Sequence, residues 1–79
     1  MDTKELVDRT KRVFVSTFGP EVSFDVGLSR LDEARWTSLR HVEFIIALEH
    51  EFGVRFDGAD ATDMISIEIV LERLTQRLQ

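Results

Sequence analysis

Residues 36–56 read WTSLRHVEFIIALEHEFGVRF, and this stretch predicts one helix with defined ends. Thr37 and Ser38 are both residue types that cap helix N-termini, and Gly53 is favoured just past a helix C-terminus. No proline or glycine interrupts the fifteen residues before Gly53. We therefore expect a helix over residues 38–52.

This expected helix carries two separate apolar stripes. At about 100° per residue, one broad arc has the spacing of a core-facing surface. Its residues are His41, Phe44, Ile45, Leu48 and Phe52. A second apolar line on another side consists of Leu39, Val42 and Ile46. Because Glu43 and Glu49 flank this second line, it is typical of a docking surface; a central helix with neighbours on two sides is the alternative interpretation.

The same stretch resembles the acyl carrier proteins. The resemblance is carried by Thr-Ser-Leu at residues 37–39, by Val42-Glu43, and by Ala-Leu-Glu-x-Glu-Phe-Gly at residues 47–53, and it is closest over residues 36–74. In that family an Asp-Ser-Leu motif opens the second helix of a four-helix bundle. The resemblance implies an all-α fold for residues 1–79: one acyl carrier domain, a small four-helix bundle with a long first loop.

The resemblance also implies a function. The family's motif serine carries a 4′-phosphopantetheine arm, and the matching residue is Ser38. The implied protein presents an acyl group, held as a thioester on that arm, to partner enzymes. Its partners would be a phosphopantetheinyl transferase and acyl-loading and acyl-transferring enzymes with basic patches. The expected partner-binding residues are Leu39, Val42, Glu43, Ile46 and Glu49.

Three residues near Ser38 depart from the family pattern. Thr37 stands where the family has aspartate, Arg35 where it often has glycine, and Arg40 where an acid is common. The surroundings of Ser38 are therefore predicted to be basic. This favours a specialised fatty-acyl or polyketide-type carrier with its own enzymes over a housekeeping fatty-acid carrier.

Composition limits the other functions. The length of 79 residues predicts one small domain. The chain has no cysteine, which excludes disulfides and cysteine-based metal sites. Residues 41–72 carry eight acids and one base, so nucleic-acid binding is not expected and basic partners are favoured. No apolar run reaches the roughly 18 residues of a membrane span, and the polar N-terminus lacks a secretory signal. We expect a free-standing, monomeric cytoplasmic protein.

The remaining segments predict three more helices. Asp2-x-x-Glu5 resembles a capping box, and Gly19-Pro20 would end a helix over residues 3–18. A short turn is expected over residues 59–64, and a helix capped by Ser66 over residues 66–78. The long connection of residues 19–36 would be anchored by its apolar residues, and a strand there is rejected because it has no partner. These anchors are Val22, Phe24, Val26, Leu28 and Leu31.

Catalysis by the chain itself is not expected. A nucleophilic Ser38 would need a base, and His41 falls on the core-facing arc. The aspartates at residues 57, 60 and 63 do not match a calcium loop, and no metal site is predicted. Two alternatives stay open: an unmodified helical interaction domain of the same fold, and a carrier of aminoacyl or peptidyl groups.

Overall fold

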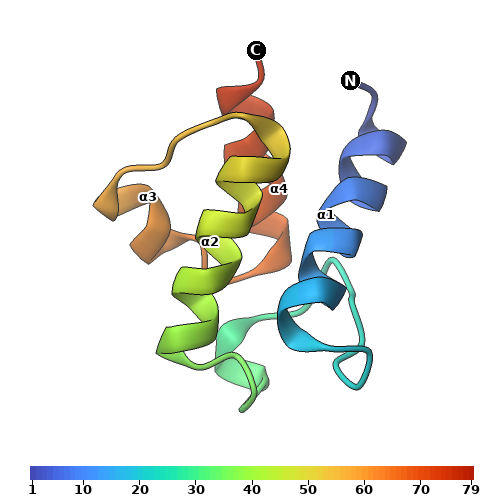
Figure 1. The fold of residues 1–79 in the computed structure, drawn as a ribbon, viewed down its shortest axis with the longest axis vertical. Coiled ribbons are helices and arrows are strands. Elements are labelled where there is room, and N and C mark those ends of the chain that lie inside the picture. Colours follow the sequence, from blue (N-terminus) through green and yellow to red (C-terminus); the bar gives the residue numbers. More distant parts are fainter.

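The computed structural model describes residues 1–79 as a small all-helical bundle. Its elements are α1 (Thr3–Phe18), the 3₁₀ turn η1 (Arg30–Asp32), α2 (Ser38–Phe52), α3 (Gly58–Asp63) and α4 (Ile67–Arg77). Helix α1 runs antiparallel to α2 and α4, the short α3 lies to one side, and both termini lie at the same end (Figure 1). The expectation of four helices is confirmed; α3 lies one residue earlier than predicted, and α4 is shorter than predicted by one residue at each end. No strand forms in the long connection, but η1 within it was not predicted.

Each α-helix begins at a polar side chain that binds a free backbone N–H of the first turn. Asp2 accepts from the N–H of Glu5 at 2.7 Å, as the capping motif predicts. Thr37, and not Ser38, caps α2 by accepting from the N–H of Arg40 at 3.2 Å. Ser38 is therefore the first helical residue, and its hydroxyl is not used for capping. The remaining caps are Asp57 for α3 and Ser66 for α4.

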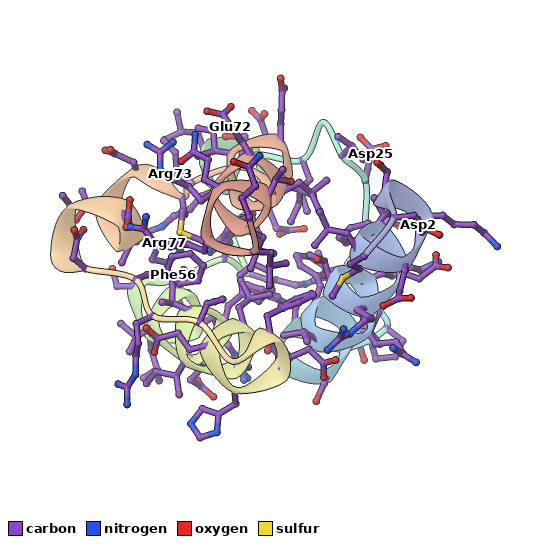
Figure 2. The ribbon with its side chains drawn as sticks, turned by 90° about the horizontal axis from the view of Figure 1, so that it is seen from above. Asp2, Asp25, Phe56, Glu72, Arg73 and Arg77 are labelled. Carbon is purple, nitrogen blue, oxygen red and sulfur yellow. The ribbon has the colours of Figure 1, made fainter.

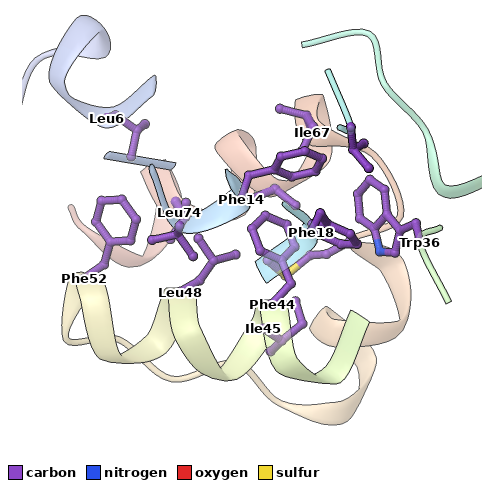
Figure 3. Close-up of a cluster of buried hydrophobic side chains, with 14 residues drawn as sticks. Leu6, Phe14, Phe18, Trp36, Phe44, Ile45, Leu48, Phe52, Ile67 and Leu74 are labelled. Carbon is purple, nitrogen blue, oxygen red and sulfur yellow. The ribbon is translucent and has the colours of Figure 1, made fainter. Parts of the chain in front are cut away.

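One apolar core joins α1, α2, α4 and the long connection (Figure 3). At its centre Phe14 and Phe44 are fully buried, with ring centroids 5.7 Å apart and edge-to-face geometry. Trp36 packs on Phe18 at 5.5 Å and brings the end of the connection into this cluster. The predicted core stripe of α2 is confirmed, because all five of its residues are buried: His41, Phe44, Ile45, Leu48 and Phe52.

Two of the predicted anchors of the long connection lie outside the core. Val26 and Leu31 are exposed, Leu31 to 86%, because the chain turns outward at residues 26–27 and again through η1. They are not anchors as predicted; Val22 is buried and Phe24 and Leu28 are partly buried. Leu78 is also exposed, because α4 ends at Arg77.

Two hydrogen bonds attach the long connection to the junction of α3 and α4. The N–H of Arg30 donates to the carbonyl of Ile65 at 2.7 Å, and the N–H of Ile67 donates to the carbonyl of Leu28 at 3.0 Å. They fix the position of η1 relative to the bundle. None of the helices is long and apolar enough to cross a membrane.

Ion pairs join α3 to α4. Asp60 is paired with Arg73 at 3.3 Å and also with Arg77, and Figure 2 shows both arginines beside α3. Asp63 pairs with Arg73 at 3.4 Å, and Asp57 caps α3. The three aspartates of residues 57–63 are thus used in capping and in ion pairs, and the structure holds no cluster of potential metal ligands.

Candidate functional site

Ser38 lies on the surface where the long connection meets α2. Its side chain is exposed, and its hydroxyl oxygen accepts a hydrogen bond from Nη2 of Arg30 at 2.8 Å. The same guanidinium donates through Nε to the carbonyl of Trp36 at 3.3 Å. The hydroxyl is thus open to solvent on a fixed helix terminus, with one cationic group beside it.

A buried network behind Ser38 fixes this geometry. The indole Nε1–H of Trp36 donates to Nδ1 of His41 at 2.9 Å. Nε2 of His41 lies 2.6 Å from the carbonyl oxygen of Ala61 in α3. Trp36 and His41 are both buried, and both imidazole nitrogens are occupied. His41 is therefore unavailable as a base for Ser38, and Ser38 forms no hydrogen bond with a histidine or carboxylate.

Three arginines, Arg30, Arg35 and Arg40, lie near Ser38, and the two closest in sequence were predicted. Nη1 of Arg35 donates to the carbonyl of Glu21 and Nη1 of Arg40 donates to that of Thr17, both at 3.2 Å. No carboxylate lies within 4 Å of the guanidinium of Arg30 or Arg35, and Arg40 has only the pair with Glu43 at 3.8 Å. Arg30 and Arg35 thus form no ion pair within the chain, and the Glu33 carboxylate accepts from the backbone N–H of Arg35 at 2.9 Å.

Next to Ser38, α2 presents an exposed apolar surface, which we call the α2 strip: Leu39, Val42 and Ile46. Their exposed fractions are 71%, 54% and 49%. These values separate the strip from the buried residues of the same helix and agree with the predicted second stripe. Nothing else in the chain covers it.

The two acids predicted beside the α2 strip differ in their environments. Glu43 is exposed and lies next to Arg40. Glu49 is partly buried, and its carboxylate accepts a hydrogen bond from the N–H of Phe56 at 2.8 Å. Its position therefore stabilises the turn after α2, and its carboxylate is less free for a partner than that of Glu43.

Sequence reasoning missed Arg30. It identified Arg35 and Arg40 because they are close to Ser38 in sequence, whereas Arg30 reaches Ser38 only through the path of the connection. The available local signal for a turn before Arg30 was Ser29, because serine often starts tight turns. In the structure Ser29 caps η1 by accepting from the N–H of Leu31 at 3.2 Å. The chain matches no protein-family model. Its function must therefore be inferred from Ser38 and the residues around it.

Proposed function

We propose that this protein is an acyl carrier whose Ser38 bears 4′-phosphopantetheine. The observation that carries the proposal is an exposed, non-capping serine hydroxyl at the first residue of α2, next to an exposed apolar strip on the same helix. A carrier needs such a hydroxyl and a surface to which enzymes can bind. It needs no catalytic base of its own, and His41 supplies none.

The attachment step transfers the 4′-phosphopantetheinyl group from coenzyme A to Ser38. The oxygen of Ser38 attacks the phosphorus atom that bears pantetheine, and a P–O ester bond forms. The pyrophosphate P–O bond of coenzyme A breaks and 3′,5′-ADP leaves. The proton of the hydroxyl passes to a base of the transferase. The terminal thiol of the arm then holds the acyl group as a thioester.

The α2 strip suits the second requirement, docking to successive enzymes. Leu39, Val42 and Ile46 supply apolar contact area, and Glu43 supplies an exposed charge that orients a basic partner. Removing these side chains should weaken partner binding with little effect on the fold, because they are already exposed.

Intact mass measures the modification directly. Protein isolated from its native host should carry one phosphopantetheine, and the Ser38→Ala variant should carry none. Ser23→Ala is the matched control, because Ser23 is exposed but lies in the long connection away from a helix start. Unmodified wild-type protein from the host would contradict the proposal and favour an interaction domain without an arm.

The mass of the cargo separates the kinds of carrier. Hydroxylamine releases a thioester-bound group, and the mass of the released hydroxamate identifies it. A fatty-acyl or polyketide-type group supports the proposed pathway class. An amino acid or peptide would instead assign the protein to the aminoacyl or peptidyl carriers.

A further inference from the structure

Arg30 is held in place from two sides. Its backbone N–H donates to the carbonyl of Ile65 at 2.7 Å, which attaches η1 to the α3–α4 junction. Its guanidinium Nε donates to the carbonyl of Trp36 at 3.3 Å, and Trp36 is itself buried and bonded to His41. The direction of the Arg30 side chain toward Ser38 is therefore set by the bundle.

The guanidinium of this arginine forms no ion pair within the chain. No carboxylate lies within 4 Å of the Arg30 guanidinium, although the whole protein carries a net charge of −5. A guanidinium has five N–H donors, and only two of them are used here, on the Trp36 carbonyl and the Ser38 hydroxyl. A fixed cation with unused donors at this distance suits an anion attached to Ser38.

We propose that Arg30 is a phosphate clamp, which binds the phosphate ester carried by Ser38. This inference rests on the proposed function, since it takes the phosphodiester of the arm as the anion. On attachment, the serine oxygen becomes the bridging ester oxygen, the phosphorus lies one bond beyond it, and the non-bridging oxygens lie two bonds beyond it. The guanidinium then donates to those oxygens, in the forked geometry that arginine forms with phosphates.

The clamp is specific to Arg30 among the three arginines near the site. Arg35 and Arg40 direct Nη1 to the carbonyls of Glu21 and Thr17, and neither donates to the Ser38 hydroxyl. They raise the local potential, whereas Arg30 makes the contact. The α2 macrodipole favours an anion at the same end and would add to the binding by Arg30.

The clamp has a consequence for the arm. It holds the first bond of the arm beside η1, and the mobile part begins beyond the phosphate. Arg30 is thus a positioning residue: it sets the direction in which the arm leaves the protein and takes no part in acyl chemistry.

A phosphoserine probe tests the clamp without any transferase. Phosphoserine is incorporated in place of Ser38 by genetic-code expansion, and its phosphate is titrated by ³¹P NMR in full-length protein. A nearby guanidinium stabilises the dianion, so the pKa of the phosphate should fall by about one unit from its ordinary value near 6. In the Arg30→Gln background the pKa of the phosphate should return most of the way to that ordinary value.

Arg35→Gln is the matched control, because it removes a guanidinium that also forms no ion pair but donates to the Glu21 carbonyl and not to Ser38. Arg35→Gln should preserve most of the lowering of the phosphate pKa, and Arg30→Lys should preserve part of it. Amide spectra of each variant establish that the fold is intact. Equal pKa values in the wild-type, Arg30→Gln and Arg35→Gln backgrounds would overturn the clamp.

A second measurement uses the arm itself. In protein loaded with phosphopantetheine, ³¹P relaxation should report a less mobile phosphodiester in the wild type than in Arg30→Gln, and equal mobility would overturn the clamp. The two proposals fail separately. Absence of the arm on protein from the host contradicts the proposed function, while the phosphoserine titration still decides whether Arg30 binds a phosphate on Ser38.

Discussion

The Trp36 indole donates its N–H to Nδ1 of His41 at 2.9 Å, on the buried side of the candidate site. An indole nitrogen can only donate, so Nδ1 must be unprotonated and accept. The carbonyl of Ala61, 2.6 Å from Nε2, can only accept, so Nε2 must carry the proton. The contacts therefore require the neutral Nε2–H tautomer, and this imidazole connects the start of α2 to α3.

Replacing His41 should destabilise the protein strongly. His41→Ala leaves the Trp36 indole N–H and the Ala61 carbonyl without their partner and opens a cavity. The expected loss is about 3 kcal/mol of the free energy of unfolding, measured by denaturant titration. His50→Ala is the control: His50 is exposed on the same helix, and its removal should cost less than about 0.5 kcal/mol.

The tautomer itself can be observed by long-range ¹H–¹⁵N NMR. The spectrum should show an unprotonated Nδ1 and a protonated Nε2 for His41. A protonated Nδ1 would contradict the network, because two N–H groups would then face each other between Trp36 and His41.

The two faces of α2 should respond differently to truncation. Phe44 is fully buried and touches three aromatic rings, so Phe44→Ala should cost about 3–5 kcal/mol. Val42 is 54% exposed, so Val42→Ala should cost under about 0.5 kcal/mol. Denaturant melts of the two variants provide the comparison, and equal losses would show that the faces are wrongly assigned.

Much of α2 could be predicted because its pattern is local. The 3.6-residue period determines which residues share a face, and it separated Phe44 from Val42 without knowledge of the neighbours. Caps and glycine stops depend on adjacent residues too, which explains why the ends of α1 and α2 were predicted at the observed residues.

The contacts that the sequence did not reveal depend on the path of the loops. Arg30 reaches Ser38 because the connection is attached at Ile65, a residue far away in the chain. Leu31 is exposed because η1 turns it outward, although its type suggested an anchor. Glu49 is used by Phe56 because the chain folds back after Gly53. None of these contacts follows from periodicity.

Arg9 should contribute to the packing of α1 on the end of α2. Its Nε donates to the Glu51 carboxylate at 2.7 Å, its Nη2 donates to the Glu51 carbonyl at 2.8 Å, and its guanidinium lies 4.7 Å from the centre of the Phe52 ring. Because the ion pair is partly exposed, Arg9→Ala should cost only about 1 kcal/mol. Thermal and denaturant unfolding measure the loss.

Arg12→Ala is the matched control for Arg9. Arg12 is exposed on the next turn of α1 and forms no salt bridge, so its removal should change the free energy of unfolding by less than about 0.5 kcal/mol. Part of the Arg9 effect should persist at high salt, because the bond to the Glu51 carbonyl and the contact with Phe52 are poorly screened. Equal losses for both arginines would contradict this role.

The last prediction concerns recognition of Ser38 by a phosphopantetheinyl transferase adapted to acidic carriers. The basic patch of such an enzyme would meet Arg30, Arg35 and Arg40 here, and like charges slow association. The double change Thr37→Asp with Arg40→Asp should therefore raise the rate of modification. Aspartate also caps helices and suits their first turn, but Arg40→Asp removes the bond to the Thr17 carbonyl and the pair with Glu43, so the free energy of unfolding should fall by about 1 kcal/mol.

The rate of mass gain with a coenzyme A donor measures this effect. The gain from the double change should shrink as salt rises, because exposed charges are screened over about 8–10 Å at moderate ionic strength. A salt-independent gain would point to altered contacts and not to charge, and no gain at low salt would refute the electrostatic argument. Ser38→Ala in the same background is the blank. Mass gained by that blank would place the attachment site elsewhere, whatever the charges around Ser38 do.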